Sequence, residues 1–136
     1  MNIFLDTSAI IALINERDAS HAEAAEIMRR IKLREIPLTR FVTTEHVLGE
    51  TLTFMSCTLK RHDLAVTTGE AIMNSNFIEI FRINDEVLRA AWETFKKRRE
   101  VSFADCVSFV LMEYLGIDHA FTLDVHFRQM GYTLYP

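Results

Sequence analysis

The sequence has few of the residues that make linkers, tails and sharp turns. Its 136 residues include only four glycines and two prolines, and no Gly/Ser run, low-complexity stretch or internal repeat interrupts them. This scarcity argues against a flexible linker or a disordered tail, and a chain of this length suits one compact core rather than two. We therefore predict a single domain over residues 1–136.

Thiols and long apolar runs are also scarce. The two cysteines, Cys57 and Cys106, show no CxxC spacing and lie in apolar segments with helical periodicity. The apolar N-terminal stretch is interrupted by Asp6 and has no basic leader, and no apolar run approaches the ~18 residues of a membrane-spanning helix. These absences predict buried free thiols in a reducing cytoplasm. They also predict that the protein has no membrane partner.

An excess of positive charge is absent too. Lys and Arg number 15 against 19 Asp and Glu, which gives a net charge of −4. That balance excludes a broad cationic surface of the kind used to bind nucleic acid. Phosphate can still bind where bound cations reverse the charge of an acidic site. The basic runs at 29–34 and 96–99 are most simply solvated helix faces, and the second is the better candidate for RNA contacts because it precedes the segment that holds Asp105.

Strand-like and helix-like segments alternate along the chain. We predict strands at 2–5, 41–43, 77–83, 119–123 and 132–135. We predict helices from Thr7 onward, over 18–35, 44–59 and 62–75, after the caps Asn84 and Ser102, and as a turn at 125–130. This order predicts the α/β class with a mainly parallel sheet, in which ligands bind beyond the carboxyl ends of the strands.

Three aspartates lie where such a site would form. Asp6 and Asp124 each end a predicted strand, although each could instead cap the helical segment that follows it. Asp105 lies in SFADCVSFVLM, a helix that is apolar on nearly every side, where a buried carboxylate is costly unless it is paired or bound to metal. Alternatively, Asp105 stabilises the positive end of its helix, three residues after Ser102.

Two glutamates in TTEHVLGETLTF are further candidates. Glu45 and Glu50 point about 140° apart on a helix, so one site would use one of them, and spacing alone does not choose. The five histidines show no HExxH motif or paired metal spacing. His126, two residues after Asp124, is interpreted as structural or solvent-exposed. Oxygen ligands without histidine or thiolate favour Mg²⁺ or Mn²⁺ over zinc.

Four segments occur together in an informative order: FLDTSAIIAL, TTEHVLGETLTF, SFADCVSFVLM and AFTLDVHFRQMGY. With them the chain resembles the PIN-domain ribonucleases over essentially its whole length, specifically the VapC-like toxins of toxin–antitoxin systems. The resemblance implies a three-layer α/β/α fold whose acids bind Mg²⁺ or Mn²⁺ and hydrolyse RNA phosphodiester bonds. By motif, it implies that the acids are Asp6, Glu50, Asp105 and Asp124, with Ser8 and Thr122 as supporting hydroxyls.

The resemblance also implies partners. An RNA is the substrate, a second copy of the chain forms a homodimer, and a small antitoxin covers the acidic site in a type II pair. The alternative is a non-catalytic PIN-like module that binds RNA or protein. A phosphatase that uses Asp6 as its nucleophile is disfavoured because Thr7 and Ser8, rather than the second acid of a DxD motif, follow it.

Overall fold

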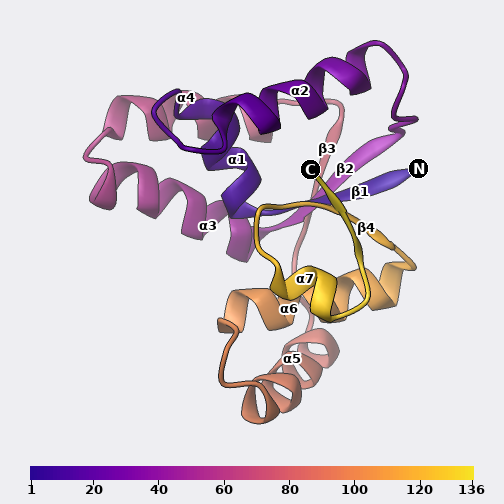
Figure 1. The fold of residues 1–136 in the computed structure, drawn as a ribbon. Coiled ribbons are helices and arrows are strands. Elements are labelled where there is room, and N and C mark those ends of the chain that lie inside the picture. The colour runs from indigo at the N-terminus through magenta and orange to yellow at the C-terminus, as the bar shows by residue number, and fades with distance from the viewer.

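One five-stranded sheet forms the centre of the protein in the computed structural model, which describes all residues from 1 to 136 (Figure 1). All neighbouring strands are parallel, and their spatial order is β3-β2-β1-β4-β5. The strands are β1 (Asn2–Leu5), β2 (Arg40–Thr44), β3 (Ile78–Phe81), β4 (His119–Phe121) and β5 (Thr133–Tyr135). The predicted α/β class is confirmed, and the sheet is parallel throughout.

Helices cover both faces of this sheet, which confirms the predicted three-layer arrangement. In Figure 1, α1 to α4 lie on one side of the strands and α5 to α7 on the other. The chain first steps from β1 to β3 and then returns to add β4 and β5 on the other side of β1. Since parallel crossovers share one handedness, this reversal places the two sets of helices on opposite faces. None of the helices is long and apolar enough to cross a membrane. Their bounds are α1 (Thr7–Ile14), α2 (His21–Lys32), α3 (Glu45–Thr53), the π-helical segment η1 (Phe54–Thr58), α4 (His62–Met73), α5 (Asp85–Lys97), α6 (Phe103–Leu115) and α7 (His126–Gln129).

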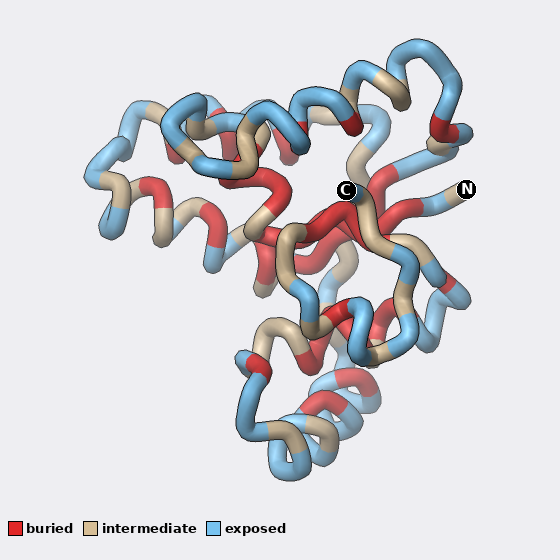
Figure 2. The backbone as a smooth tube through the Cα atoms, viewed as in Figure 1, coloured by how far each residue is buried: buried red, intermediate tan, exposed pale blue.

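The core lies along the central strands, where buried positions are continuous (Figure 2). Ile3 and Phe4 of β1 are fully buried, as expected for a strand with helices on both faces. Phe127 of α7 stacks on Phe4 with ring centroids 6.2 Å apart and meets Phe109 of α6 edge-on at 4.8 Å. Each such side chain contributes roughly 1.5–3 kcal/mol when it is fully buried. These contacts fix α6 and α7 beneath the sheet.

Several elements are shorter than predicted, for local reasons. Helix α2 begins at His21 rather than residue 18, because the Asp18 carboxylate accepts the Ser20 N–H at 2.8 Å in a turn. It ends at Lys32, shortly before Arg34 adopts a left-handed φ of 60°. The predicted helix over 44–59 continues from α3 into the π-helical η1. The strand predicted over 119–123 ends at Phe121, because side-chain hydroxyls accept the backbone N–H groups that follow.

The order of strands reverses beside β1. Strand β2 pairs with one of its edges and β4 with the other, and the Asp6 N–H donates to the Phe121 carbonyl at 3.1 Å. In open parallel sheets, ligands bind in the crevice at this reversal, outside the carboxyl ends of the strands. The fold therefore places the residues that follow β1 and β4 at the expected binding position.

Candidate active site

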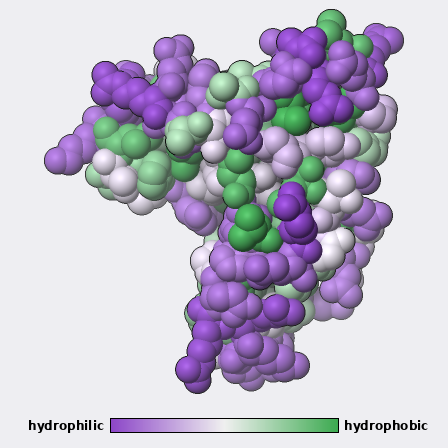
Figure 3. Space-filling model, viewed as in Figure 1, coloured by the Kyte–Doolittle hydropathy of each residue, from purple (hydrophilic) through white to green (hydrophobic).

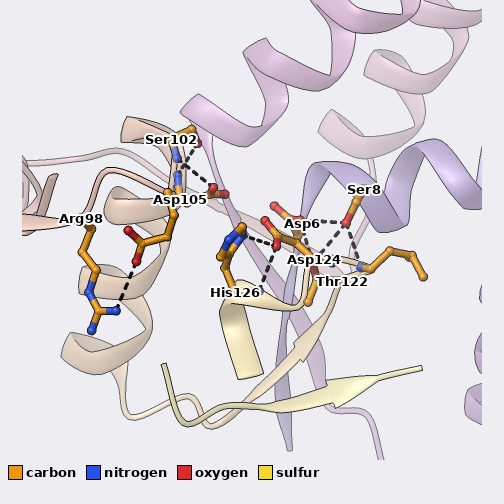
Figure 4. Close-up of polar contacts among 10 residues, drawn as sticks. Asp6, Ser8, Arg98, Ser102, Asp105, Thr122, Asp124 and His126 are labelled. Carbon is orange, nitrogen blue, oxygen red and sulfur yellow. Dashed lines mark hydrogen bonds and ion pairs between the residues drawn. The ribbon is translucent and has the colours of Figure 1, made fainter. Parts of the chain in front are cut away.

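Asp6 follows β1 and is 6% exposed. It occupies the position before α1 with an extended backbone, but its side chain makes no capping hydrogen bond, so the alternative of a helix cap is wrong. Its Oδ2 instead accepts hydrogen bonds from the Ser8 Oγ at 2.9 Å and the Thr122 Oγ1 at 2.8 Å (Figure 4). Burial raises the pKa of the Asp6 carboxyl, and these two hydrogen bonds partly offset the rise.

The hydroxyls of Ser8 and Thr122 also shape the loop after β4. Ser8 Oγ accepts the Leu123 N–H at 2.9 Å, and Thr122 Oγ1 accepts the Asp124 N–H at 3.0 Å. The N–H groups of Leu123 and Asp124 therefore bond to side-chain hydroxyls instead of extending strand β4. Thr122 Oγ1 thus bonds both the Asp6 carboxylate and the Asp124 backbone, which links two acids that are far apart in the sequence (Figure 4).

Asp124 is half-buried, and the turn that follows it holds its carboxylate. Its Oδ1 accepts the His126 backbone N–H at 2.9 Å and contacts the His126 ring Nδ1 at 2.7 Å. Asp124 therefore does bond a backbone donor of the next helical segment, as its alternative role proposed. The sequence interpretation gave His126 no part in the site. The Asp-x-His spacing was the available signal, because an aspartate in a turn reaches the residue two positions on.

Asp105 fills the helix-end role considered for it, and its carboxylate also lies near the other acids. Its Oδ2 accepts the Ser102 N–H at 3.1 Å while its own N–H donates to Ser102 Oγ at 3.0 Å, which is a complete capping box at the start of α6. In Figure 4 this carboxylate faces Asp6 and Asp124. Burial raises the pKa of Asp105 and the charge of Asp124 adds to the rise, while the hydrogen bonds from Ser102 and the nearby His126 lower it.

Hydroxyl contacts fix helix α3 against α1. Thr51 Oγ1 donates to Thr7 Oγ1 at 3.1 Å, and Thr7 Oγ1 in turn reaches the Val47 carbonyl at 3.4 Å. Both threonines are buried. Since Glu50 directly precedes Thr51 in the helix, this contact sets the position from which Glu50 projects.

The two glutamates of α3 have different surroundings. Glu45 accepts the Ile83 N–H on its Oε1 at 3.1 Å, so its carboxylate is held at the loop after β3. Partial burial raises the pKa of Glu50, and the charges of Asp6 and Asp105 raise it further. Only Glu50 of the pair therefore faces the aspartates, a choice that helical spacing left open.

The hydrogen bonds of the three aspartates share one pattern. The side-chain partners and backbone donors that hold each carboxylate contact a single oxygen: Oδ2 of Asp6, Oδ2 of Asp105 and Oδ1 of Asp124. No Lys or Arg forms an ion pair with these residues or with Glu50. The second oxygens and the uncompensated negative charge fit a hard divalent cation such as Mg²⁺ or Mn²⁺.

The arrangement is nevertheless open. No three His, Cys, Asp or Glu side chains stand close enough together to enclose a metal ion. Mg²⁺ retains several waters and needs few direct carboxylate ligands, so this donor set fits a hydrated ion better than a closed protein cage. In Figure 3 the surface is hollowed between the arm made by α3 and α4 and the arm made by α5 and α6.

Comparisons with other proteins agree with this geometry. The sequence profile of the PIN domain matches residues 3–131. The 23S rRNA-specific endonuclease VapC20 of Mycobacterium tuberculosis is 33% identical over 132 residues, which cover 96% of this chain and 95% of that protein. The VapC ribonuclease of Archaeoglobus fulgidus is 29% identical over 120 residues, 86% of this chain and 74% of that protein.

A solved structure gives the same result. The crystal structure of M. tuberculosis VapC20, described as a sarcin–ricin loop cleaving toxin, matches with a TM-score of 0.82 at 33% identity, covering 96% of each chain. Profile, sequence and fold thus agree over nearly the whole length. The chain belongs to the PIN-domain family, among its VapC-like ribonucleases.

Proposed function

We propose that the protein is a metal-dependent endoribonuclease in which Asp6, Glu50, Asp105 and Asp124 are the metal-binding and catalytic residues. The observation that carries the proposal is the shared pattern of the three aspartates, each held by one oxygen and free at the other where the strand order reverses. Glu50 adds a fourth carboxylate, whose pKa is raised first by partial burial and then by the charges of Asp6 and Asp105.

A bound Mg²⁺ or Mn²⁺ supplies an activated water and neutralises phosphate charge during hydrolysis. The chain's own residues provide the ligands and fix their directions. Ser8 and Thr122 orient Asp6, Ser102 orients Asp105, and the turn at His126 orients Asp124. Burial of Asp6 also excludes water from one side of the site and strengthens its interaction with a cation.

We further propose that this ribonuclease is the toxin of a type II toxin–antitoxin pair in the cytoplasm, with a homodimer as its working form. The relatives named for ribosomal RNA cleavage support RNA as the substrate and make large ribosomal RNA the first one to test. The apolar groove between α3 and α4 offers a surface for a protein partner, because Val66 and Met73 on it are 47% and 59% exposed.

The proposal is tested by incubating the purified protein with ribosomal RNA and Mn²⁺, with an EDTA control. Asp6→Asn and Asp105→Asn should each lower the cleavage rate by about 100-fold or more, since each removes a charged ligand that contributes several kcal/mol. Cleavage that persists in EDTA, or in either variant, would show that another site or a contaminant is responsible. RNA binding without cleavage would favour the non-catalytic module.

A matched pair of glutamates sharpens the assignment. Glu50→Gln should reduce cleavage by roughly tenfold or more, because it removes a charge beside Asp6 and Asp105. Glu45→Gln changes the same residue type in the same helix but keeps an oxygen for the Ile83 N–H, so cleavage should stay near the wild-type rate. Equal losses in the two variants would reject Glu50 as the fourth acid.

A further inference from the structure

A row of aromatic rings crosses from α5 to α3. Trp92 and Phe95 stack on α5 with centroids 6.0 Å apart and an interplanar angle of 27°. Phe95 meets Phe103, the first residue of α6, edge-on at 5.8 Å, and Phe103 meets the ring of His46 in α3 at 6.2 Å. We call Trp92, Phe95, Phe103 and His46 the aromatic row.

One end of the aromatic row lies beside the acids. His46 is one helical turn before Glu50, on the same face of α3, and Phe103 lies in the first turn of α6, as Asp105 does, although a spacing of two residues points their side chains in different directions. The other end reaches solvent on α5, where Trp92 is 52% exposed and Phe95 is 37% exposed. The row therefore leads from the candidate active site out onto the arm made by α5 and α6.

Packing does not account for the outer part of the row. Helix α5 buries Val87 and Ala91 against the rest of the protein, Phe95 continues that stripe one turn after Ala91, and Trp92 lies beyond its margin. Leu88, one turn before Trp92, is 42% exposed and extends the same apolar margin. Contiguous exposed apolar side chains with polar residues around them mark interaction surfaces.

Positive charge borders this stripe. Arg89 and Lys96 lie one turn before and after Trp92, so their side chains flank the indole. Of these two, Arg89 forms no ion pair, whereas Lys96 pairs with Glu93 on the same helix; Lys97 and Arg99, farther along the chain, also form none. Exposed aromatic rings with cations beside them bind unpaired nucleotides through base stacking and phosphate contacts.

We propose that the aromatic row is a base-stacking platform for unpaired nucleotides of the RNA substrate, with Trp92 as its outer stacking position. The inference rests on the proposed ribonuclease function and adds a subsite to it. A base stacked on Trp92 and Phe95 directs the strand along α5 toward Asp105 and Glu50. The charges and the continuity with the acids favour RNA over an apolar protein partner at this stripe.

Trp92 is the only tryptophan, so its fluorescence reports on this position alone. The wild-type protein is titrated in EDTA and low salt with a single-stranded RNA of about 12 nucleotides, and separately with an abasic strand of equal length. Stacking predicts strong quenching by the base-containing RNA and little by the abasic strand. Equal quenching by both, or none by either, would overturn the platform. So would a response to protein concentration alone, which would indicate self-association through α5.

Variants test the same point with labelled RNA and fluorescence anisotropy. Trp92→Ala and Phe95→Ala should each weaken binding about tenfold, while Trp92→Phe should bind almost as well as wild type because it keeps a stacking ring. The matched control is Phe77→Ala, since Phe77 is 67% exposed but lies before β3 at the opposite edge of the sheet. Unchanged affinity in Trp92→Ala, or an equal loss in Phe77→Ala, would contradict the proposal.

These measurements are independent of cleavage. Quenching by bases in a protein that never cleaves RNA would leave the platform standing and reject the ribonuclease. Cleavage that depends on Asp6 and Asp105, without any quenching of Trp92 fluorescence, would support the ribonuclease and reject the platform.

Discussion

The two edges of the sheet are built from different chemistry. At the carboxyl edge, buried polar residues end or follow the strands: Thr44 is the last residue of β2, and Asp6 and Thr122 come directly after β1 and β4. At the amino edge, a cavity is lined mainly by apolar side chains, including Ile36 and Phe77. Both edges belong to the same five parallel strands. Apolar packing accounts for the amino edge. The carboxyl edge instead holds the buried acid Asp6, whose charged form is costly to bury.

The carboxyl edge keeps that charge through directed hydrogen bonds. Ser8 and Thr122 donate to the Asp6 carboxylate and lower its pKa, but burial outweighs them and the net direction is a rise. Functional sites commonly hold such unfavourable groups, which the surrounding structure must support. The comparison therefore predicts that stability and activity respond to different substitutions at the two edges.

The largest expected change in stability comes from the amino edge. Ile36 is 2% exposed, and Ile36→Ala should lower the free energy of unfolding by about 2–5 kcal/mol because it leaves a cavity. Denaturant unfolding measures this loss. RNA cleavage per folded molecule, assayed well below the melting temperature, should stay at the wild-type rate, in contrast to Asp6→Asn. A cleavage loss in Ile36→Ala as large as that in Asp6→Asn would contradict the prediction that substitutions at the amino edge affect stability and not activity.

A smaller and opposite change is expected at the carboxyl edge. The native Asp6 carboxyl keeps its proton above the ordinary value of 3.8, so between 3.8 and the raised pKa the native chain binds more protons than the unfolded chain. The Asp6 contribution to stability therefore falls as pH increases through that window. Asp6→Asn removes this titration, so metal-free wild type should lose stability relative to the variant from acid to neutral pH. Unfolding free energies of both proteins, measured across that range in EDTA, give the difference.

Two results would contradict this prediction. A wild type that gains stability relative to Asp6→Asn with increasing pH would mean that hydrogen bonding outweighs burial at Asp6. Mn²⁺ that stabilises the variant at neutral pH as much as the wild type would mean that the ion binds elsewhere. In the proposed site, saturating Mn²⁺ at 100 times its dissociation constant should stabilise only the wild type, by about 2.7 kcal/mol.

The sequence predicted the order of the elements well, because their periodicities and caps are local. The Asn84 cap accepts the Val87 N–H at 2.9 Å, Ser102 caps α6 and Gly116 ends it with a φ of 66°, so the bounds of α5 and α6 are nearly as predicted. Strand ends were predicted less well. Strand β4 stops because Ser8, from a distant part of the chain, accepts a backbone N–H of the next loop.

The candidate site was predictable only in part. Asp6 and Asp124 could be placed at one edge because parallel strands align their carboxyl ends. The family resemblance pointed to Glu50, but helical spacing could not choose between Glu45 and Glu50. Spacing gives directions about the helix's own axis, whereas the Thr51–Thr7 contact sets how that helix lies against α1. The aromatic row was missed for a similar reason: its rings come from three helices, and no local pattern joins them.

The smallest effect separates the two basic runs, which also lie toward opposite edges. Arg29 and Arg30 pair with Glu26 and Glu35 on and just beyond α2, near the amino-edge cavity. Lys97 and Arg99 form no ion pair, and they precede the helix of Asp105. Removing both of the latter by alanine substitution should lower the slope of log affinity against log salt by about 1.4, since each phosphate contact on a single strand contributes about 0.7.

The matched double substitution of Arg29 and Arg30 should leave that slope unchanged, because neighbouring carboxylates already neutralise both side chains. RNA affinities measured over a salt series in EDTA give the two slopes. Equal slopes for wild type and both variants would place the phosphate contacts elsewhere. A larger change of slope from the Arg29 and Arg30 substitutions would place the bound RNA at the amino edge. It would contradict the proposal that the carboxyl edge binds the substrate.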